Sequence, residues 1–235
     1  MLFVSAVVSL GAQEPCVLSS SHDEFRIIHV TGRPKLSLDE SSPQWADGAG
    51  QSLSKDCYRQ IDYPETRTTI KAFWTDSDLY VFFRCPYSEL NVFEPANHGA
   101  ARVGLWDRDV VEMFIGDDWK NTGHYREFEV APTGDWIDLA IDLDRKSSDQ
   151  TWRSGWETLA RVDEAQRVWY AAARIPLKAV SDKPVTEGTK WRVNFYRIDG
   201  PGGNETRHFM CWQPTCDRKR GNHTPESFGT LVFGR

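Results

Sequence analysis

The sequence lacks the short motifs that identify several large classes of enzyme. Its 235 residues contain no GxSxG, no P-loop, no GxGxxG and no HExxH. Serine hydrolases of the nucleophile-elbow type, P-loop NTPases, dinucleotide enzymes and zinc peptidases are therefore not indicated. No CxxC or HxxxH spacing occurs, so the cysteines and histidines do not predict a structural zinc site. Low-complexity tracts, internal repeats and alternation of strands with helices are also missing, which makes a Rossmann or TIM-barrel fold a poor expectation.

Positive charge and long apolar runs are scarce as well. Lysine and arginine total 28 against 34 aspartates and glutamates, a net charge of −6. No surface that neutralises phosphates is implied, and we expect no nucleic-acid partner. The first residues, LFVSAVVSL, are apolar but too few to span a bilayer. They resemble an export signal without its basic start, so we expect residues 1–20 to be a signal peptide and flexible N-terminus, cleaved near Ala12. The protein would then be secreted or periplasmic, with no membrane span.

The chain has only five cysteines, and an odd number leaves at least one thiol unpaired within the chain. Cys211 and Cys216 in CWQPTC could close a short loop if the protein is exported. Cys85 follows VFFR at a strand end and reads equally well as a buried thiol.

Short apolar segments separated by turn residues predict an all-β fold, a sandwich or a barrel. Residues 68–85 hold two strands joined at 75–78, and residues 124–143 form a hairpin that turns at 132–134. The second arm of that hairpin alternates apolar and polar side chains, as half-buried antiparallel strands do. Further strands bring the expected total to at least seven, in a single domain over residues 21–235. Residues 38–56 read as a polar loop, and residues 175–181 as one helical turn.

The stretch LWDRDVVEMFIGDDW places a carboxylate inside a buried-type strand. Side chains alternate across a strand, so one face carries the apolar Val111, Met113 and Ile115. The other face carries Val110, Glu112 and Phe114. A charge among apolar neighbours is rarely buried without a partner. Glu112 therefore either pairs with an arginine or lines a cavity for a polar ligand; the arginines on expected strands are Arg126, Arg192 and Arg197.

Two tryptophans in expected loops favour the cavity. Trp106 and Trp212 would expose apolar area unless a ligand covers them. Indole rings stack on the C–H face of a pyranose, while charged groups bind its hydroxyls. Six extended residues span about 20 Å. Trp106 and Glu112 can therefore contact one sugar only if the strand begins near Asp109 and Trp106 lies in a loop that folds back over it.

Other residue clusters permit other chemistry. Asp76, Asp78, Asp117 and Asp118 are weak candidates for a calcium site, although solvated turns have the same composition. Paired carboxylates would also suit a glycosidase. His208 and Met210 are residue types that ligate haem, yet two residues on one strand face cannot reach both sides of one haem.

Seven segments together resemble the family 9 carbohydrate-binding modules and their stand-alone relatives, over roughly residues 25–235. They occur in the order LYVFFRC, WDRDVVEMFI, YREFEVAPTGDWIDL, ARIPL, WRVNFYRID, CWQPT and PESFGTLVF. The resemblance implies a jelly-roll-like β-sandwich of two antiparallel sheets with structural calcium. In sugar-binding members two tryptophans clamp a terminal sugar, and a strand glutamate bonds its hydroxyls. By position Trp106, Trp212 and Glu112 take these places, and Arg126 resembles a binding arginine.

Two departures from the family pattern bear on the site. ARIPL has alanine where relatives often carry an acidic residue, and CWQPTCDRKRGNHTPESFG is basic and flanked by cysteines. The resemblance implies a monomeric, non-catalytic protein that binds oligo- or polysaccharide ends during carbohydrate breakdown. Three alternatives stay open: a haem-b-binding electron-transfer sandwich, a glycoside hydrolase that uses Glu112, and a structural or adhesion sandwich without a small ligand.

Overall fold

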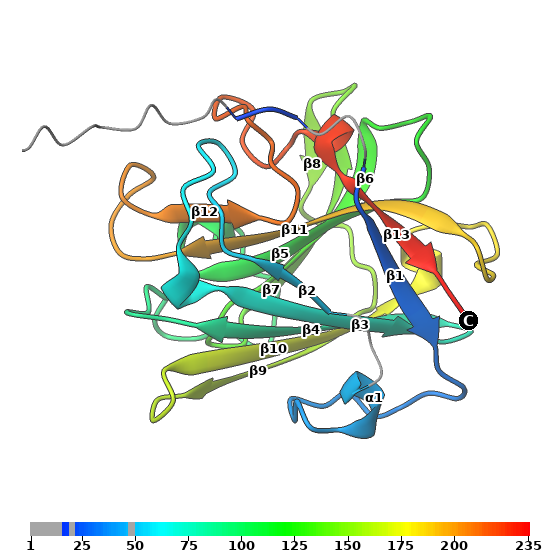
Figure 1. The fold of residues 1–235 in the computed structure, drawn as a ribbon, viewed down its shortest axis with the longest axis horizontal. Helices are drawn as coiled ribbons and strands as arrows, with labels where there is room; N and C mark the ends of the chain where they lie inside the picture. The colour runs from blue at the N-terminus through cyan, green and yellow to red at the C-terminus, as the bar shows by residue number, and fades with distance from the viewer. Residues whose placement is uncertain (1–15, 19–21, 47–49) are drawn as a thin grey trace, which may run out of the picture.

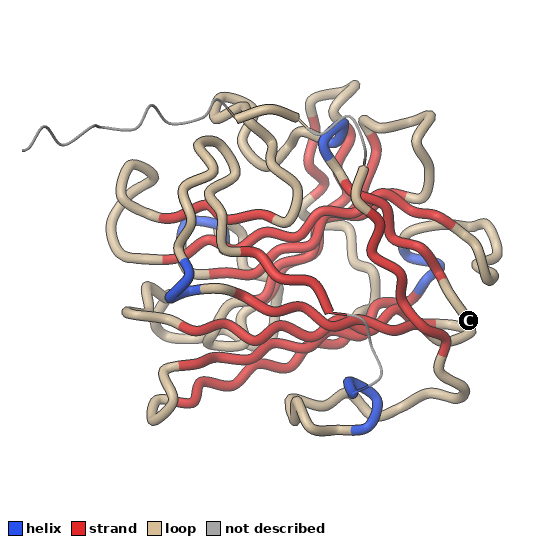
Figure 2. Tube along the Cα trace, in the orientation of Figure 1, coloured by secondary structure: helices blue, strands red, loops and turns tan. Residues whose placement is uncertain are grey.

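Two packed β-sheets form the framework of the computed structural model, which describes residues 16–18, 22–46 and 50–235 (Figures 1 and 2). The thirteen strands of these ranges are β1 (Glu24–His29), β2 (Gly50–Leu53), β3 (Thr68–Trp74), β4 (Asp78–Pro86), β5 (Val110–Gly116), β6 (His124–Val130), β7 (Trp136–Asp142), β8 (Ser147–Asp149), β9 (Glu157–Asp163), β10 (Val168–Pro176), β11 (Lys190–Asp199), β12 (His208–Cys211) and β13 (Gly229–Phe233). The helical turns are α1 (Pro43–Ala46), η1 (Pro64–Thr66), η2 (Leu105–Asp107), η3 (Leu177–Ala179) and η4 (Pro225–Ser227). None of the described helices is long and apolar enough to cross a membrane, and the expected signal segment lies outside the described residues.

The predicted sandwich of two largely antiparallel sheets is confirmed. One sheet has the order β8-β7-β6-β5-β11-β13-β1, and β12 pairs with the remaining length of β11. The other sheet has the order β1-β3-β4-β10-β9, with β2 beside β3. Strand β1 belongs to both sheets, because its first residues pair in parallel with β13 and its last two with β3. It runs from one layer to the other in Figure 1.

The sequence located eight of the strands found in the described ranges and missed β1, β2, β8, β9 and β12, as well as the short helix α1. Both predicted hairpins are present, β3–β4 turning at residues 75–78 and β6–β7 turning at residues 132–134. The helical turn expected within residues 175–181 is η3. The segment read as a loop over residues 38–56 contains α1 and β2 instead, because Trp45 is fully buried against Phe73 and Phe82 of the sheet.

The main apolar core lies between the two sheets. Val111, Met113 and Ile115 of β5 belong to it, as their alternation predicted. A second apolar cluster covers the outer face of the sheet that contains β5, β6, β7 and β11. Phe114 and Leu139 belong to this outer cluster. Loops fold over this outer face, so this sheet is buried on both sides and can carry an enclosed site away from the core.

The cysteines pair over long sequence distances, and the predicted short Cys211–Cys216 loop is wrong. Cys57 is bonded to Cys211, and Cys16 is bonded to Cys216. Cys211 faces outward on β12, opposite Tyr196 of β11. The segment around Cys57 crosses β12 there, and the backbone N–H of Cys57 donates a hydrogen bond to the carbonyl of Phe209. Cys85 is the buried free thiol that its position suggested.

Candidate functional site

A cavity of about 490 Å³ opens on the outer face of β5, β6, β7 and β11. Its floor comes from the strands through Glu112, Phe114, Glu127, Leu139 and Ile198. Its walls come from five covering segments, which contribute Tyr58, Trp106, Asp107, Ser148, Gln150, Asn204, Arg207, Phe209, Arg218, Gly221, Asn222 and His223. Cavities of this size with apolar walls and a few converging polar groups are typical of small-ligand sites.

Glu112 is the buried carboxylate at the centre of the floor, with an exposed fraction of 2%. It lies opposite Glu129 of β6 and Tyr196 of β11, both on the outer face. Its Oε2 accepts a 2.8 Å hydrogen bond from Nδ2 of Asn222. Within the described ranges, Glu112 makes no ion pair with Arg126, Arg192 or Arg197. Glu112 therefore lines a cavity and is not paired with one of these arginines.

Asn222 is held in place by two tyrosine hydroxyls. The hydroxyl of Tyr58 donates to Oδ1 of Asn222 over 3.3 Å, and the hydroxyl of Tyr196 donates to its carbonyl over 2.9 Å. Tyr196 in turn accepts a 2.9 Å bond from Nδ2 of Asn194, two residues back on β11. The motif WRVNFYRID thus supports the Glu112 site through its outward-facing Asn194 and Tyr196.

Three buried glutamates share the outer face of β5 and β6: Glu112, Glu127 and Glu129. Burial, reinforced by the neighbouring Glu127 carboxylate, raises the pKa of Glu112 to about 8. Burial also raises the pKa of Glu127 and places that of Glu129 well above its usual range. The side chains of Asn222 and Arg207 oppose the shift at Glu112, since both favour the charged carboxylate. Burial thus favours the protonated form of all three carboxyl groups.

Trp106 folds back over the strand that follows it. It lies in η2, which begins after Gly104, whose φ of +82° is readily adopted only by glycine. The strand β5 starts at Val110, and Trp106 and Glu112 line the same cavity. The geometric condition set by the sequence is therefore met.

Arg207 fixes this turn from above. Its Nη1 donates to the carbonyl of Trp106 over 3.0 Å, and its Nη2 donates to Oδ1 of Asn204. Its guanidinium lies 5.3 Å from the centre of the Phe209 ring. The segment after β11 and the turn before β5 are thereby joined at the cavity wall.

Trp212 lies on the inner side of the same sheet and does not line the cavity. Cys211 faces outward opposite Tyr196, so the next side chain turns inward. The Trp212 ring packs 6.3 Å from Phe25 and 6.1 Å from Phe195, measured between centroids. A side chain at Gly229 would collide with this ring. The expected pairing of Trp106 with Trp212 is therefore not formed, and the other rings that line the cavity with Trp106 are those of Tyr58, Phe114, Phe209 and His223.

The expected arginine also lies elsewhere. Arg126 is opposite Ile115 and Ala140, on the inner side of β6. Its Nε donates to the carbonyl of Ala179 over 3.1 Å, and its guanidinium lies 4.8 Å from the centre of the Trp152 ring. Arg207, which the sequence analysis did not select, occupies the cavity wall instead.

The four aspartates considered for calcium are engaged by nearby hydrogen-bond donors and basic groups. Asp76 bonds His29 at 2.8 Å, and Asp78 bonds Arg33 at 3.2 Å. Asp117 and Asp118 both lie near Lys183, at 3.3 and 3.4 Å. Among the described residues, none of these four aspartates belongs to a group of three side chains that could bind one metal ion together.

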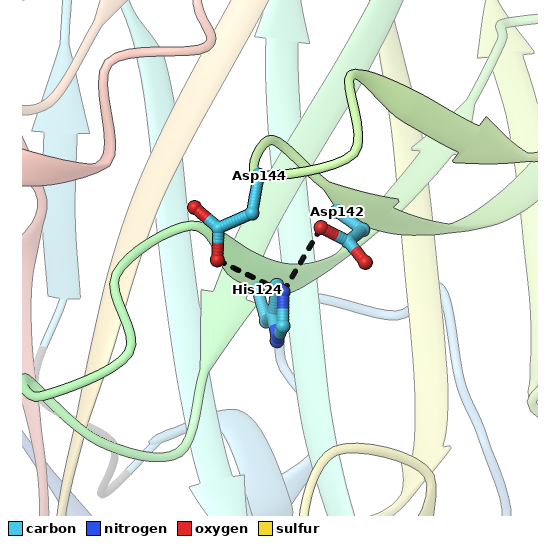
Figure 3. Close-up of side chains that lie close together, drawn as sticks. All are labelled: His124, Asp142 and Asp144. Atoms are coloured by element: carbon cyan, nitrogen blue, oxygen red, sulfur yellow. Dashed lines mark ion pairs between the residues drawn. The ribbon is translucent and has the colours of Figure 1, made fainter.

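Such a group occurs in the described chain only at His124, Asp142 and Asp144 (Figure 3). His124 Nε2 lies 2.9 Å from Oδ1 of Asp142 and 3.4 Å from Oδ2 of Asp144. The three residues lie near the surface, where β6 begins and β7 ends. Two carboxylates facing one imidazole form an ordinary surface ion-pair network.

His208 and Met210 lie in different environments. His208 stacks on Tyr63 with ring centroids 3.9 Å apart, while Met210 is fully buried in the core between the sheets. Neither residue lines the cavity.

Comparison with known proteins agrees with this architecture. The family model described as carbohydrate family 9 binding domain-like matches residues 43–234. A protein of Arthroderma benhamiae named only as an extracellular protein is 23% identical over 145 residues, which are 57% of this chain and 64% of that relative. The match thus spans less than two thirds of the relative's length.

Two solved structures have a similar fold at 17% identity. A candidate carbohydrate-binding protein from Bacteroides uniformis has a TM-score of 0.71, covering 91% of this chain and 100% of the other. A family 9 carbohydrate-binding module from Caldicellulosiruptor kristjanssonii, solved with cellotriose, has a TM-score of 0.63, covering 91% and 95%.

Proposed function

The chain belongs to the carbohydrate family 9 binding domain-like family, and we propose on this basis that it binds carbohydrate without catalysing a reaction. The ligand site is the cavity over Glu112, and the ligand is the end of an oligo- or polysaccharide. The observation that carries the proposal is the position of Glu112, a buried carboxyl group fixed by Asn222 on the floor of a ring-lined cavity.

Each part of the cavity matches one part of a sugar. The indole of Trp106 offers a flat apolar surface for the C–H face of a pyranose, and Tyr58 and Phe209 offer further ring surface. Glu112, Asn222 and Arg207 supply hydrogen-bonding groups at fixed positions for hydroxyls. Phe114, Leu139 and Ile198 add apolar surface to the floor beside Glu112 and Glu127, and a cavity that ends in such a floor favours a chain end over the middle of a long polymer.

We infer that the protein works outside the cell. Two disulfides support this, because such bonds persist in oxidising compartments. The printed name of the Arthroderma relative, an extracellular protein, supports it as well.

Isothermal titration with glucose, xylose and cello-oligosaccharides tests the proposal. We expect Trp106→Ala and Glu112→Gln each to weaken binding at least about tenfold, because each removes a central contact worth about 1.4 kcal/mol or more. Trp136→Ala is the matched control, since Trp136 lies at the start of β7 away from this cavity. Equal binding by wild type and Trp106→Ala would place the sugar elsewhere.

A hydrolase acting through Glu112 is the competing interpretation, and the same samples distinguish it. We expect no release of product from chromogenic glycosides by protein that binds the corresponding sugar. Release that is lost in Glu112→Gln would replace the binding proposal with a catalytic one.

A further inference from the structure

Glu112 and Glu127 line the cavity floor, and Glu129 lies beside them on the same sheet face, so the site contains more carboxyl groups than the surrounding cations neutralise. Glu112 and Glu129 are directly opposed across β5 and β6, and Glu127 lies two residues from Glu129 on the same face. All three side chains are buried, with exposed fractions of 2%, 0% and 4% in the order Glu112, Glu129 and Glu127. Neither carboxyl oxygen of Glu129 accepts a hydrogen bond from a donor group of the described residues, and its side chain lies within hydrogen-bonding reach of the Glu127 carboxyl group. Buried acidic groups of this kind normally have a charged partner or carry a proton.

The two arginines of the cavity wall are directed at other groups. Arg207 donates to the carbonyls of Trp106 and Arg108 and to Asn204. Arg218 donates to the carbonyl of Asn204 and to the exposed carboxylate of Glu205. Within the described ranges, no lysine, arginine or histidine forms an ion pair with any of the three glutamates. The cluster therefore has room for a positive charge supplied by a ligand.

The geometry favours an organic cation over a bare metal ion. Calcium needs several oxygens converging on one point. Among the described residues, three metal-type ligands come within 4.8 Å of one another only at His124, Asp142 and Asp144, and the glutamate cluster does not meet this spacing. The cavity volume of about 490 Å³ and its aromatic wall suit a larger ligand, and rings such as Trp106 also attract cations.

We propose that the cavity preferentially takes a sugar that carries a positively charged amino group, a glucosamine-type residue, with its ammonium beside Glu112 and its ring against Trp106. This inference rests on the proposed carbohydrate-binding function and names its ligand class. Charge-assisted hydrogen bonds between an ammonium and a carboxylate are stronger than those between neutral groups, and the buried site screens them little.

Binding of such a ligand requires a carboxylate, so a proton must leave. The protonated carboxyl group of Glu112 loses its proton to solvent, and the carboxylate then accepts hydrogen bonds from the ammonium. The titratable and charged groups that surround Glu112 are Glu127, Glu129 and Tyr125 on β6, Tyr196 on β11, Asp107 in η2, and Tyr58, Arg207, Arg218 and His223 in the covering loops. The pKa of Glu112 in the free protein is about 8, so affinity should rise with pH below that value.

Three ligands of matched length test the inference: a β-1,4-linked glucosamine tetramer, its fully N-acetylated form and cellotetraose. Isothermal titration is carried out at pH 5, 6 and 7 in two buffers with different ionisation enthalpies. We expect the glucosamine tetramer to bind about tenfold more tightly than cellotetraose at pH 7. Its affinity should increase by up to about tenfold per pH unit, with about one proton released per ligand.

The outcomes separate this inference from the function beneath it. Equal binding of all three ligands without proton release would overturn the amino-sugar preference and leave carbohydrate binding intact. Failure of all three to bind would overturn both. Tight, proton-coupled binding of the glucosamine tetramer alone would support the inference and narrow the ligand class.

A pair of isosteric variants assigns the effect to the cluster. Glu112→Gln keeps the size of the side chain and removes the charge, so the glucosamine preference and the proton release should both disappear. If Glu112→Gln proves difficult to fold, Glu127→Gln is the second variant to measure, and it should also reduce the glucosamine preference. Glu157→Gln on β9 is the matched control, because Glu157 is an exposed partner of Arg174 remote from the cavity. Persistence of the tenfold preference in folded Glu112→Gln would contradict the proposal.

Discussion

Asn222 Nδ2 donates a 2.8 Å hydrogen bond to Glu112 Oε2 and so joins a loop near the end of the chain to the middle of β5. The two residues are 110 positions apart in the sequence. Their contact fixes the position of the Glu112 carboxyl group, which lies on an otherwise apolar strand face and forms part of the cavity floor. It also predicts that Asn222 matters for the ligand as much as Glu112 does.

Replacing Asn222 with alanine should weaken sugar binding more than it weakens the fold. The change removes the donor to Glu112 and the acceptor for Tyr58, each worth about 0.5–1.5 kcal/mol. We expect affinity to fall about tenfold and the melting temperature to drop by a few degrees, measured by titration and calorimetry. Unchanged affinity in a folded Asn222→Ala protein would show that this loop does not set the ligand geometry.

Tyr196→Phe should disturb the site through Asn222. The Tyr196 hydroxyl accepts from Asn194 and donates to the carbonyl of Asn222, so its loss removes two hydrogen bonds worth about 0.5–1.5 kcal/mol each. We expect lower stability together with weaker sugar binding.

Tyr80→Phe provides the control for that variant. Its hydroxyl donates to the carbonyl of Pro34 over 2.9 Å, on the other sheet and away from the cavity. This variant should lose stability and keep its affinity. If both variants lose affinity equally, the effect of Tyr196→Phe is a general loss of structure.

The sequence predicted what local patterns determine. Alternation along β5 identified Val111 as a core residue and placed Glu112 on the opposite face. The distance along an extended strand showed that Trp106 must fold back, and η2 provides that turn.

Contacts between distant segments were not predictable in the same way. Asn222, Arg207 and Tyr58 reach the cavity from irregular loops, where no periodicity indicates side-chain direction. The basic stretch CDRKRGNHTPESFG was the one signal near them. Trp212 lies in a loop, as expected, but the short strand β12 before it turns its ring inward, and β12 has no distinct sequence pattern of its own. Disulfide partners 154 and 200 residues apart are set by the fold and not by spacing.

Reduction of the disulfides should loosen the cavity walls. Cys57 lies next to Tyr58, and Cys216 lies in the loop that leads to Asn222. We expect the wild type to lose about 2–5 kcal/mol of stability per bond in reductant and to bind sugar more weakly.

Thiol counting by alkylation and mass spectrometry checks the assignment behind that prediction. One thiol, that of Cys85, should react in the unfolded oxidised protein, and two more should react for each disulfide reduced. Cys85→Ala is the control, because its response to reductant should match that of the wild type. A product in which Cys211 is bonded to Cys216 would contradict the long-range pairing.

The buried glutamates should make the protein less stable as pH rises. A carboxyl group whose pKa is raised by folding binds more protons in the native state than in the unfolded state between the two pKa values. The stability it contributes is therefore complete below about pH 4.5 and is lost as pH increases toward about 8, the pKa of Glu112.

Glu129→Gln removes one such group, so its melting temperature should exceed that of the wild type at pH 8 and match it near pH 4. Glu24→Gln removes a surface carboxylate whose pKa is lowered by Lys190 and should not be stabilising at pH 8. If Glu129→Gln and the wild type have the same melting temperature at every pH, the charge of Glu129 does not destabilise the folded protein and the prediction is wrong.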